Sequence, residues 1–220
     1  VEIGGLVTAR ATDFNLKPNE TPSDGCITGY GVINGNLVYV YSQDASVLNG
    51  TIGEMHAKKI TNLYDLAMKT GAPVIGLIES AGLRLQEATD ALAAFGEIYL
   101  KQTLASGVIP QITAIFGSCG GGLALMPTLT DFTFMEESKA KLFVNAPNTL
   151  DGNHVSKCDS ASAKFQSEEA GIVDVVADEA TIYAKIRELV SMLPGNNEDD
   201  ASYEECTDDL NRVCGDLANC

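Results

Sequence analysis

Two stretches of this chain share one order of features: an apolar run, a glycine-containing turn and a helical pattern. In the more pronounced one, the β-branched run at 111–116 predicts a buried strand, and three successive glycines stand at 120–122. Small and apolar residues from Leu123 onward predict a helix. Because glycine lacks a side chain, backbone N–H groups at such a turn can approach a ligand closely. The unit suits an anion, or an oxygen that becomes anionic during a reaction, near the positive end of the helix.

A second stretch upstream repeats this order. Residues 74–78 predict a strand, residues 79–84 form the turn, and residues 85–100 show the helical spacing of apolar residues. Two strand–turn–helix units whose turns expose bare backbone can direct two N–H donors at one oxygen. Most glycine-rich turns serve packing alone, so the pair supports a site better than either turn does.

The rest of the chain predicts an α/β fold with a layered, largely parallel sheet. Two alternating β-rich runs flank Asn34 and Gly35, which is a strong hairpin signal. Further along we expect a helix at 54–69, strands at 132–135, 142–144 and 172–176, and a last helix capped by Asp178. Strands that alternate with helices are typical of parallel sheets.

The length of 220 residues fits one domain with a sizeable core. We expect this single domain to span residues 1–194. Beyond Pro194 the composition becomes acidic, so residues 195–220 are expected to form an acidic tail or the start of an inter-domain linker.

The formal net charge of -16 disfavours binding to nucleic acid or to an anionic membrane, because phosphates would be repelled. No apolar run approaches the length of a membrane span, so direct membrane contact is not expected. The six cysteines include no C-x-x-C pair, which favours reduced thiols in a cytoplasmic protein over a zinc or redox site. We expect no metal in this chain.

Nucleophilic catalysis is one alternative at the glycine turn. Ser118 stands where a strand meets a helix, but the nucleophile-elbow pattern needs glycine two residues earlier, and Phe116 occupies that position. Only His56 and His154 could serve as its base. Cys119 is the weaker nucleophile candidate, since small buried cysteines commonly neighbour glycines.

Acid–base catalysis by carboxylates is a second alternative. Glu79 and Glu87 bracket the upstream turn, although both fit ordinary positions at a sheet edge and in a first helical turn. A Walker A phosphate loop is excluded, because no Gly-Lys-Ser or Gly-Lys-Thr follows the glycines.

Several motifs together carry a family resemblance. They are Asp24-Gly25-Cys26-Ile27-Thr28-Gly29-Tyr30-Gly31, Ala105-Ser106-Gly107-Val108-Ile109-Pro110-Gln111-Ile112 and the G-x-C-x-G-G turn at 117–122. Over about residues 1–194 the chain resembles the biotin-dependent acyl-CoA carboxyltransferases, in particular the N-terminal half of the β subunit of propionyl-CoA and methylmalonyl-CoA carboxylases.

The resemblance implies a crotonase-type ββα superhelix that binds a coenzyme A thioester, with biotin bound by a homologous second half. It implies that the chain, as a carboxyltransferase component, moves a carboxyl group between carboxybiotin and a short-chain acyl-CoA. Backbone N–H groups would stabilise the enolate oxygen formed on the way. The implied donors lie at Gly82, Leu83, Gly120 and Gly121, and the implied coenzyme A contacts at Ser80, Ala81, Arg84, Lys59, Cys119 and Gly122.

The resemblance also implies partners. These are the C-terminal carboxyltransferase half, a biotin carboxyl carrier protein bearing the biotin, and a biotin carboxylase, with this chain in a homo-oligomer. Without the second half, the chain alone is expected to be inactive. It is either a separate subunit or one domain of a longer protein.

The chain departs from the family pattern in two places. Leu83 replaces the usual alanine of the first turn, which leaves its backbone N–H in place, and residues 151–169 match less faithfully. Three other functions stay open: a biotin-dependent acyl-CoA decarboxylase subunit, a self-sufficient crotonase-type hydratase or isomerase, and a non-catalytic coenzyme A-binding or assembly subunit.

Overall fold

The computed structural model describes residues 1–11, 21–146, 159–200, 206–209, 211–213 and 215. Its strands are β1 (Glu2–Ile3), β2 (Cys26–Ile33), β3 (Asn36–Gln43), β4 (Val74–Ser80), β5 (Gln111–Gly120), β6 (Phe132–Glu136), β7 (Lys141–Phe143) and β8 (Val175–Ala177). Its helices are α1 (Glu54–Thr70), α2 (Ala88–Ala105), α3 (Leu125–Thr128), α4 (Ala163–Glu168) and α5 (Glu179–Met192), with 3-10 turns η3 (Pro22–Gly25), η4 (Leu48–Gly50), η5 (Leu85–Glu87) and η6 (Gly121–Ala124).

The predicted hairpin is confirmed. Strands β2 and β3 pair antiparallel, from Cys26 opposite Gln43 to Ile33 opposite Asn36. Between them Asn34 has a φ of 50° and Gly35 a φ of 94°. Positive φ at both central residues is what a tight two-residue hairpin turn requires, and Asn-Gly adopts it at little cost.

The sheet continues in parallel from β3 through β4, β5 and β6 to β8, with β1 antiparallel at the β2 edge and β7 beside the end of β5. This order confirms the largely parallel sheet expected from the sequence. Because parallel strands end at the same edge, the turns that follow β4 and β5 emerge side by side.

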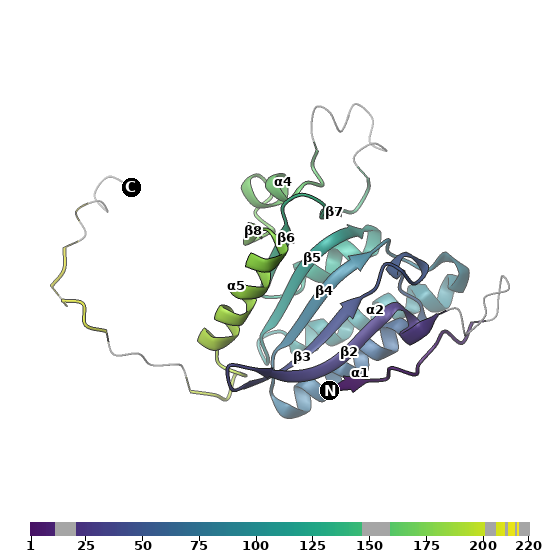
Figure 1. The fold of residues 1–220 in the computed structure, drawn as a ribbon, viewed down its shortest axis with the longest axis horizontal. Coiled ribbons are helices and arrows are strands. Elements are labelled where there is room, and N and C mark those ends of the chain that lie inside the picture. Colours follow the sequence, from purple (N-terminus) through teal and green to yellow (C-terminus); the bar gives the residue numbers. More distant parts are fainter. Residues whose placement is uncertain (12–20, 147–158, 201–205, 210, 214, 216–220) are drawn as a thin grey trace.

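Helices cover both faces of the sheet (Figure 1). Helices α1 and α2 pack on one face, over a core that includes Ile60, Leu63 and Ile98. Helix α5 lies on the opposite face, where Ile182 and Ile186 are buried with the sheet residues of a second cluster. The sheet is thus the middle of three layers, as buried parallel sheets require.

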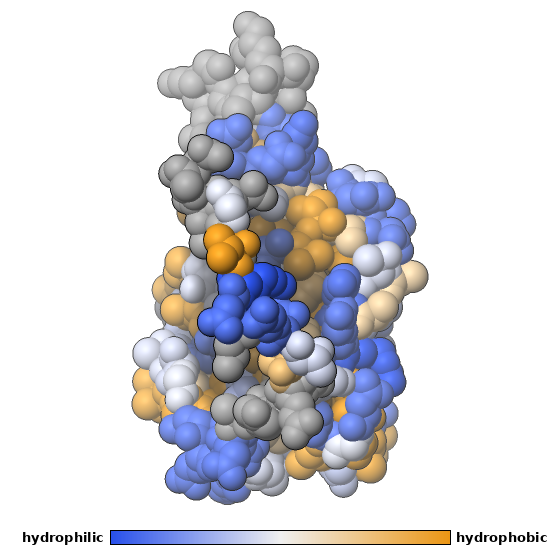
Figure 2. Space-filling view, turned by 90° about the vertical axis from the view of Figure 1, so that its left-hand side faces the viewer, coloured by the Kyte–Doolittle hydropathy of each residue, from blue (hydrophilic) through white to orange (hydrophobic). Residues whose placement is uncertain are grey.

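Helix α5 leaves part of its sheet face open. A groove of about 380 Å³ runs along β2 and β3, lined by Ile27, Val38 and Val40 among others, and Ile27 is 50 % exposed. The view from the side of α5 also shows apolar residues in a hollow that hydrophilic residues surround (Figure 2). Apolar surface therefore remains uncovered in the chain as described.

The helix ends follow the sequence signals. Helix α1 stops at Gly71, whose φ of 62° is the left-handed conformation that glycine adopts freely. The Asp178 carboxylate accepts a hydrogen bond from the Thr181 N–H at 3.1 Å, which confirms the predicted cap of α5.

The helix after the glycine turn is shorter than the sequence suggests. Gly121–Ala124 form a 3-10 turn, and α3 adds only Leu125–Thr128. Glycine disfavours the α-helix, and Pro127 removes one backbone donor, so the segment ends before β6.

Residues 12–20 and 147–158 lie outside the described residues, and with them the part of the less faithful stretch up to residue 158. Among the residues that are described, no helix is long and apolar enough to cross a membrane.

Candidate active site

The structure brings the two glycine-containing turns together. Ser80 at the end of β4 pairs with Cys119 near the end of β5. A Cβ atom added to Gly82, which has a φ of +100°, would lie 3.0 Å from the carbonyl oxygen of Gly120. Only a glycine lets the two backbones approach this closely in that conformation. The two turns therefore lie side by side, as the repeated sequence pattern predicts.

The first turn leaves one backbone donor unused. The N–H of Ala81 donates to the Asn49 carbonyl at 3.0 Å, that of Gly82 to Ser80 Oγ at 3.1 Å, and that of Arg84 to the Ile52 carbonyl at 3.0 Å. The Gly82 carbonyl and the Arg84 N–H both face Ile52 and bond to its backbone. In extended backbone the N–H groups of neighbouring residues point to opposite sides, so the Leu83 N–H points away from Ile52. It has no acceptor among the described residues, and Leu83 is half-buried.

The second turn presents backbone in a similar way. Gly121 opens the 3-10 turn with a φ of +65°, and the first N–H groups of a helical turn have no acceptor within it. A Cβ on Gly120 would lie 2.6 Å from the ring of Phe143, and one on Gly122 would lie 3.0 Å from Tyr99 Oη. A side chain at 120 or 122 would thus force Phe143 or Tyr99 to shift, while a Cβ on Gly121 would meet nothing within 4 Å.

A hollow adjoins the first turn. Its volume is about 290 Å³, and it lies between η4 and the turn residues. Its lining is Leu48, Asn49, Thr51, Ala81, Leu83, Leu85 and Gln86. It lies on the Asn49 side of the turn, where Leu48 and Leu85 form part of its apolar lining.

The two cations expected to contact coenzyme A point into the protein. The Arg84 side chain is 0 % exposed and pairs with Asp24 and Glu87. Lys59 is buried and donates from Nζ to Ser23 and to the Cys26 carbonyl, and burial lowers its pKa. Both charged groups are buried and bonded to other groups of the protein. The geometry therefore does not support the expected contact of Arg84 or Lys59 with an anionic ligand.

Comparison with known proteins identifies the family. The family model of the carboxyl transferase domain matches residues 1–219. Methylmalonyl-CoA decarboxylase subunit alpha from Propionigenium modestum is 41% identical over 215 residues, and the propionyl-CoA carboxylase beta chain from Roseobacter denitrificans is 40% identical over 216. Each alignment covers 96% of this chain. This chain belongs to the carboxyl transferase domain family.

A solved structure supports the fold of this carboxyl transferase domain. Transcarboxylase 12S, in a structure with hydrolysed methylmalonyl-coenzyme A bound, has a TM-score of 0.87 at 32% identity and covers 96% of this chain. The crotonase-like α/β fold implied by the sequence is confirmed. The domain spans 42% of each of these relatives and of that structure, so it corresponds to a part of such proteins.

The nucleophile alternatives lose support within the described residues of the carboxyl transferase domain. Cys119 is fully buried, and burial raises the pKa of its thiol well above the ordinary value. Ser118 is exposed, but His56 is buried. Its Nδ1 donates to the Asp24 carbonyl and its Nε2 accepts from Gln43 Nε2. Its pKa is lowered to about 3, mainly by burial and then by Arg84. His154 lies outside the described residues.

The carboxylate pair is also separated. Glu87 is buried and paired with Arg84, whereas Glu79 is exposed and lies against Gly117. A general acid–base pair needs both groups within reach of one substrate. The domain does not bring these two together.

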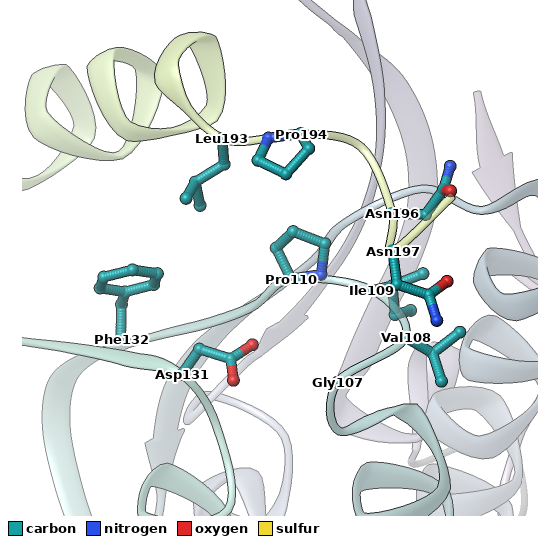
Figure 3. Close-up of a pocket in the computed structure, with 10 residues that line it drawn as sticks. All are labelled: Gly107, Val108, Ile109, Pro110, Asp131, Phe132, Leu193, Pro194, Asn196 and Asn197. Atoms are coloured by element: carbon teal, nitrogen blue, oxygen red, sulfur yellow. The ribbon is translucent and has the colours of Figure 1, made fainter. Parts of the chain in front are cut away.

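A second cavity of the domain lies at the opposite end of the sheet (Figure 3). It measures about 240 Å³ and is formed where β5 and β6 begin and where α5 ends. Phe132, Leu193 and Pro194 give it apolar walls (Figure 3). Since the turns follow the other ends of the strands, this cavity is separate from the candidate site.

Sequence reasoning missed the residues that hold the turns. Asp24 lies in a motif of the family resemblance, but no role was predicted for it. Asn49 and Ile52, whose backbone groups bind the first turn, belong to no motif that predicts this contact. Tyr99, which donates from Oη to the Gly122 carbonyl at 2.5 Å, resembled one more apolar residue of a helix. The only sequence signal for such a link to the turn was that Asp24 belongs to one of the motifs that carry the family resemblance.

Proposed function

We propose that this chain is the coenzyme A-binding half of a biotin-dependent carboxyltransferase. In this proposal, residues 1–194 form the domain that holds a short-chain acyl-CoA, such as acetyl-, propionyl- or methylmalonyl-CoA, and 195–220 lead toward the second half or form a tail. The observation that carries the proposal is the juxtaposition of two bare turns, with Gly82 against the Gly120 carbonyl. The enzyme would work in the cytoplasm with a biotin carboxyl carrier protein and a biotin carboxylase.

The chemistry assigned to this chain is stabilisation of an oxyanion. Loss of a proton or a carboxyl group from the α-carbon of a thioester places negative charge on its carbonyl oxygen. The N–H groups of Leu83 and Gly121 are the donors proposed to meet that oxygen, beside Gly82 and Gly120. Fixed donors stabilise such charge more than they stabilise the neutral carbonyl, and one donor is typically worth about 10²–10³ in rate.

Biotin, when delivered on its carrier, would supply the carboxyl group and take the α-proton. No side-chain base is then needed in this chain. The buried environments of His56 and Glu87 are consistent with that division of labour.

The proposed surface for the second half lies next to the turns. Leu92, Leu100 and Leu104 recur every four or eight residues along α2 and are 64%, 56% and 56% exposed. Gly96 continues the same row, and a Cβ there would meet nothing within 4 Å. An apolar helix row of this kind is unusual at a surface unless a partner covers it. Tyr99 of the same helix holds the second turn, so a partner on this row would also close the site.

A decarboxylase role is the second candidate, because one relative is a methylmalonyl-CoA decarboxylase subunit at 41% identity. It uses the same oxyanion chemistry, in the direction that removes a carboxyl group. The carboxylase and the decarboxylase would thus use the same two turns and differ in their partner proteins.

The deciding experiment supplies carboxybiotin and propionyl-CoA to the purified chain, with and without a candidate second-half protein. We expect binding of propionyl-CoA by calorimetry in both cases and carboxyl transfer only with the second half. Turnover by the chain alone would show that the site is not split, and no acyl-CoA binding at millimolar concentration would overturn the proposed function. Transfer of the carboxyl group from methylmalonyl-CoA to biotin on its carrier, with release of CO₂ from that carboxybiotin in the full complex, would favour the decarboxylase.

A further inference from the structure

A buried ion-pair cluster ties the first turn to the rest of the protein. Arg84 donates from Nη1 to Asp24 Oδ1 at 2.6 Å and to Glu87 Oε1 at 2.9 Å, and from Nη2 to the Thr51 carbonyl at 2.7 Å. The side chains of Asp24, Arg84 and Glu87 are 0–2 % exposed. We call these three residues the turn clamp. Burying three charged groups is costly unless each is well paired, so the cluster needs a reason.

The clamp is anchored on helix α1. The second oxygen of Asp24 accepts the backbone N–H of His56 at 2.7 Å, and the second oxygen of Glu87 accepts that of Glu54 at 2.6 Å. Both N–H groups lie in the first turn of α1 and have no acceptor within the helix. Two carboxylates and one guanidinium carry one net negative charge, which faces the positive end of this helix. Each carboxylate therefore links Arg84 directly to a core helix.

Two local features that are costly or restrictive accompany these links. Asp24 has a φ of 47°, a conformation that non-glycine residues rarely adopt. A Cβ on Gly53 would lie 2.4 Å from a carboxylate oxygen of Glu87, so only glycine lets Glu87 reach the start of α1. Such strain persists where the surroundings enforce it, and it gathers at functional sites.

The clamp fixes the backbone after the unused donor, and the Ile52 backbone fixes it on both sides. Arg84 is held by its side chain and by its N–H to Ile52, while the Gly82 carbonyl accepts the Ile52 N–H at 2.8 Å. Leu83 lies between them, so its N–H direction is set by its two neighbours. Misplacing a catalytic group by about 1 Å can cost about 10² in rate.

Resting on the proposed function, we propose that Asp24, Arg84 and Glu87 are positioning residues that aim the Leu83 N–H at the developing oxyanion. All three side chains are buried, so they would act through the turn and not on the substrate itself. The clamp differs from a purely structural cluster in one respect. Loosening it should lower the rate of the folded enzyme, in addition to lowering its stability.

The test uses Glu87→Gln, Asp24→Asn and Arg84→Lys in the assembled enzyme. Glu87→Gln and Asp24→Asn keep the side-chain shape and remove one charge. We expect kcat to fall about 10–10² fold, with KM for propionyl-CoA changed by less than about threefold, because the donor acts mainly on the transition state. Hydrogen exchange of the backbone at 79–87 should become faster. Lysine cannot make the forked contact of arginine, so Arg84→Lys should also lower kcat.

The control is Val190→Ala on α5, a buried residue on the other sheet face. It should lower the Tm by a similar amount without changing kcat of the folded enzyme. The inference would be overturned if the clamp variants have a Tm lowered as in this control, but the kcat and the exchange rates of the unmodified enzyme. If Asp24→Asn does not fold, Glu87→Gln carries the test, since it leaves the Asp24–Arg84 pair in place. Failure of the unmodified assembled enzyme to turn over would instead refute the proposed function, and the exchange measurement would still report on the clamp.

Discussion

Replacing Gly82 by alanine tests whether closeness of the two turns matters. Gly82 has a φ of +100°, and the new Cβ would lie 3.0 Å from the Gly120 carbonyl oxygen. The backbone conformation costs a non-glycine residue about 1–3 kcal/mol. For a chain of this size that corresponds to a Tm lower by about 2–12 °C. The contact must also be relieved, which moves one turn away from the other by a few tenths of an ångström.

The rate should fall more than stability alone explains. We expect Gly82→Ala to reduce kcat of the assembled enzyme by about 10–10² fold, because the two donors no longer converge on one oxygen. The matched control is Gly35→Ala in the hairpin, where φ is +94° and nothing lies within 4 Å of the added Cβ. It carries similar backbone strain far from the turns. Equal kcat for the two folded variants would refute the reasoning.

Two further variants test other parts of the account. Because burial lowers the pKa of His56 to about 3 from 6.5, the unfolded chain binds a proton that the folded chain does not between these values. The free energy of unfolding should therefore fall as the pH drops from 6.5 toward 3, by about 2 kcal/mol at pH 5, and His56→Gln should flatten this slope in urea titrations. Leu100→Glu, on the exposed row of α2, should leave the Tm within about 2 °C and weaken binding of the second half at least about tenfold. Unchanged binding in sedimentation experiments would remove α2 from the interface.

The sequence predicts the fold well because its signals are local. Alternation of apolar residues places β2 and β3, the Asn34–Gly35 turn joins them, and the glycine-containing turns follow two buried strands. Parallel order then brings the turns to one edge of the sheet. The length of the helix after Gly122 is missed, because three glycines and Pro127 oppose a pattern that apolar spacing alone supports.

The roles of charged residues depend on distant contacts that local patterns do not contain. Arg84 follows a glycine turn and resembles a ligand-binding cation, yet its partner Asp24 lies sixty positions away. Lys59 likewise reaches back to Cys26. A single sequence cannot distinguish an exposed arginine from one that is buried against two carboxylates, because that choice is made by tertiary packing.

The proposed site consists of two backbone N–H groups that converge on one thioester oxygen. The most direct measurement is a crystal structure of the assembled enzyme with an unreactive propionyl-CoA analogue. We expect the carbonyl oxygen of the analogue about 2.7–3.1 Å from the backbone nitrogens of both Leu83 and Gly121. A thioester bound elsewhere, with both N–H groups facing solvent or protein, would contradict the proposed pair of donors.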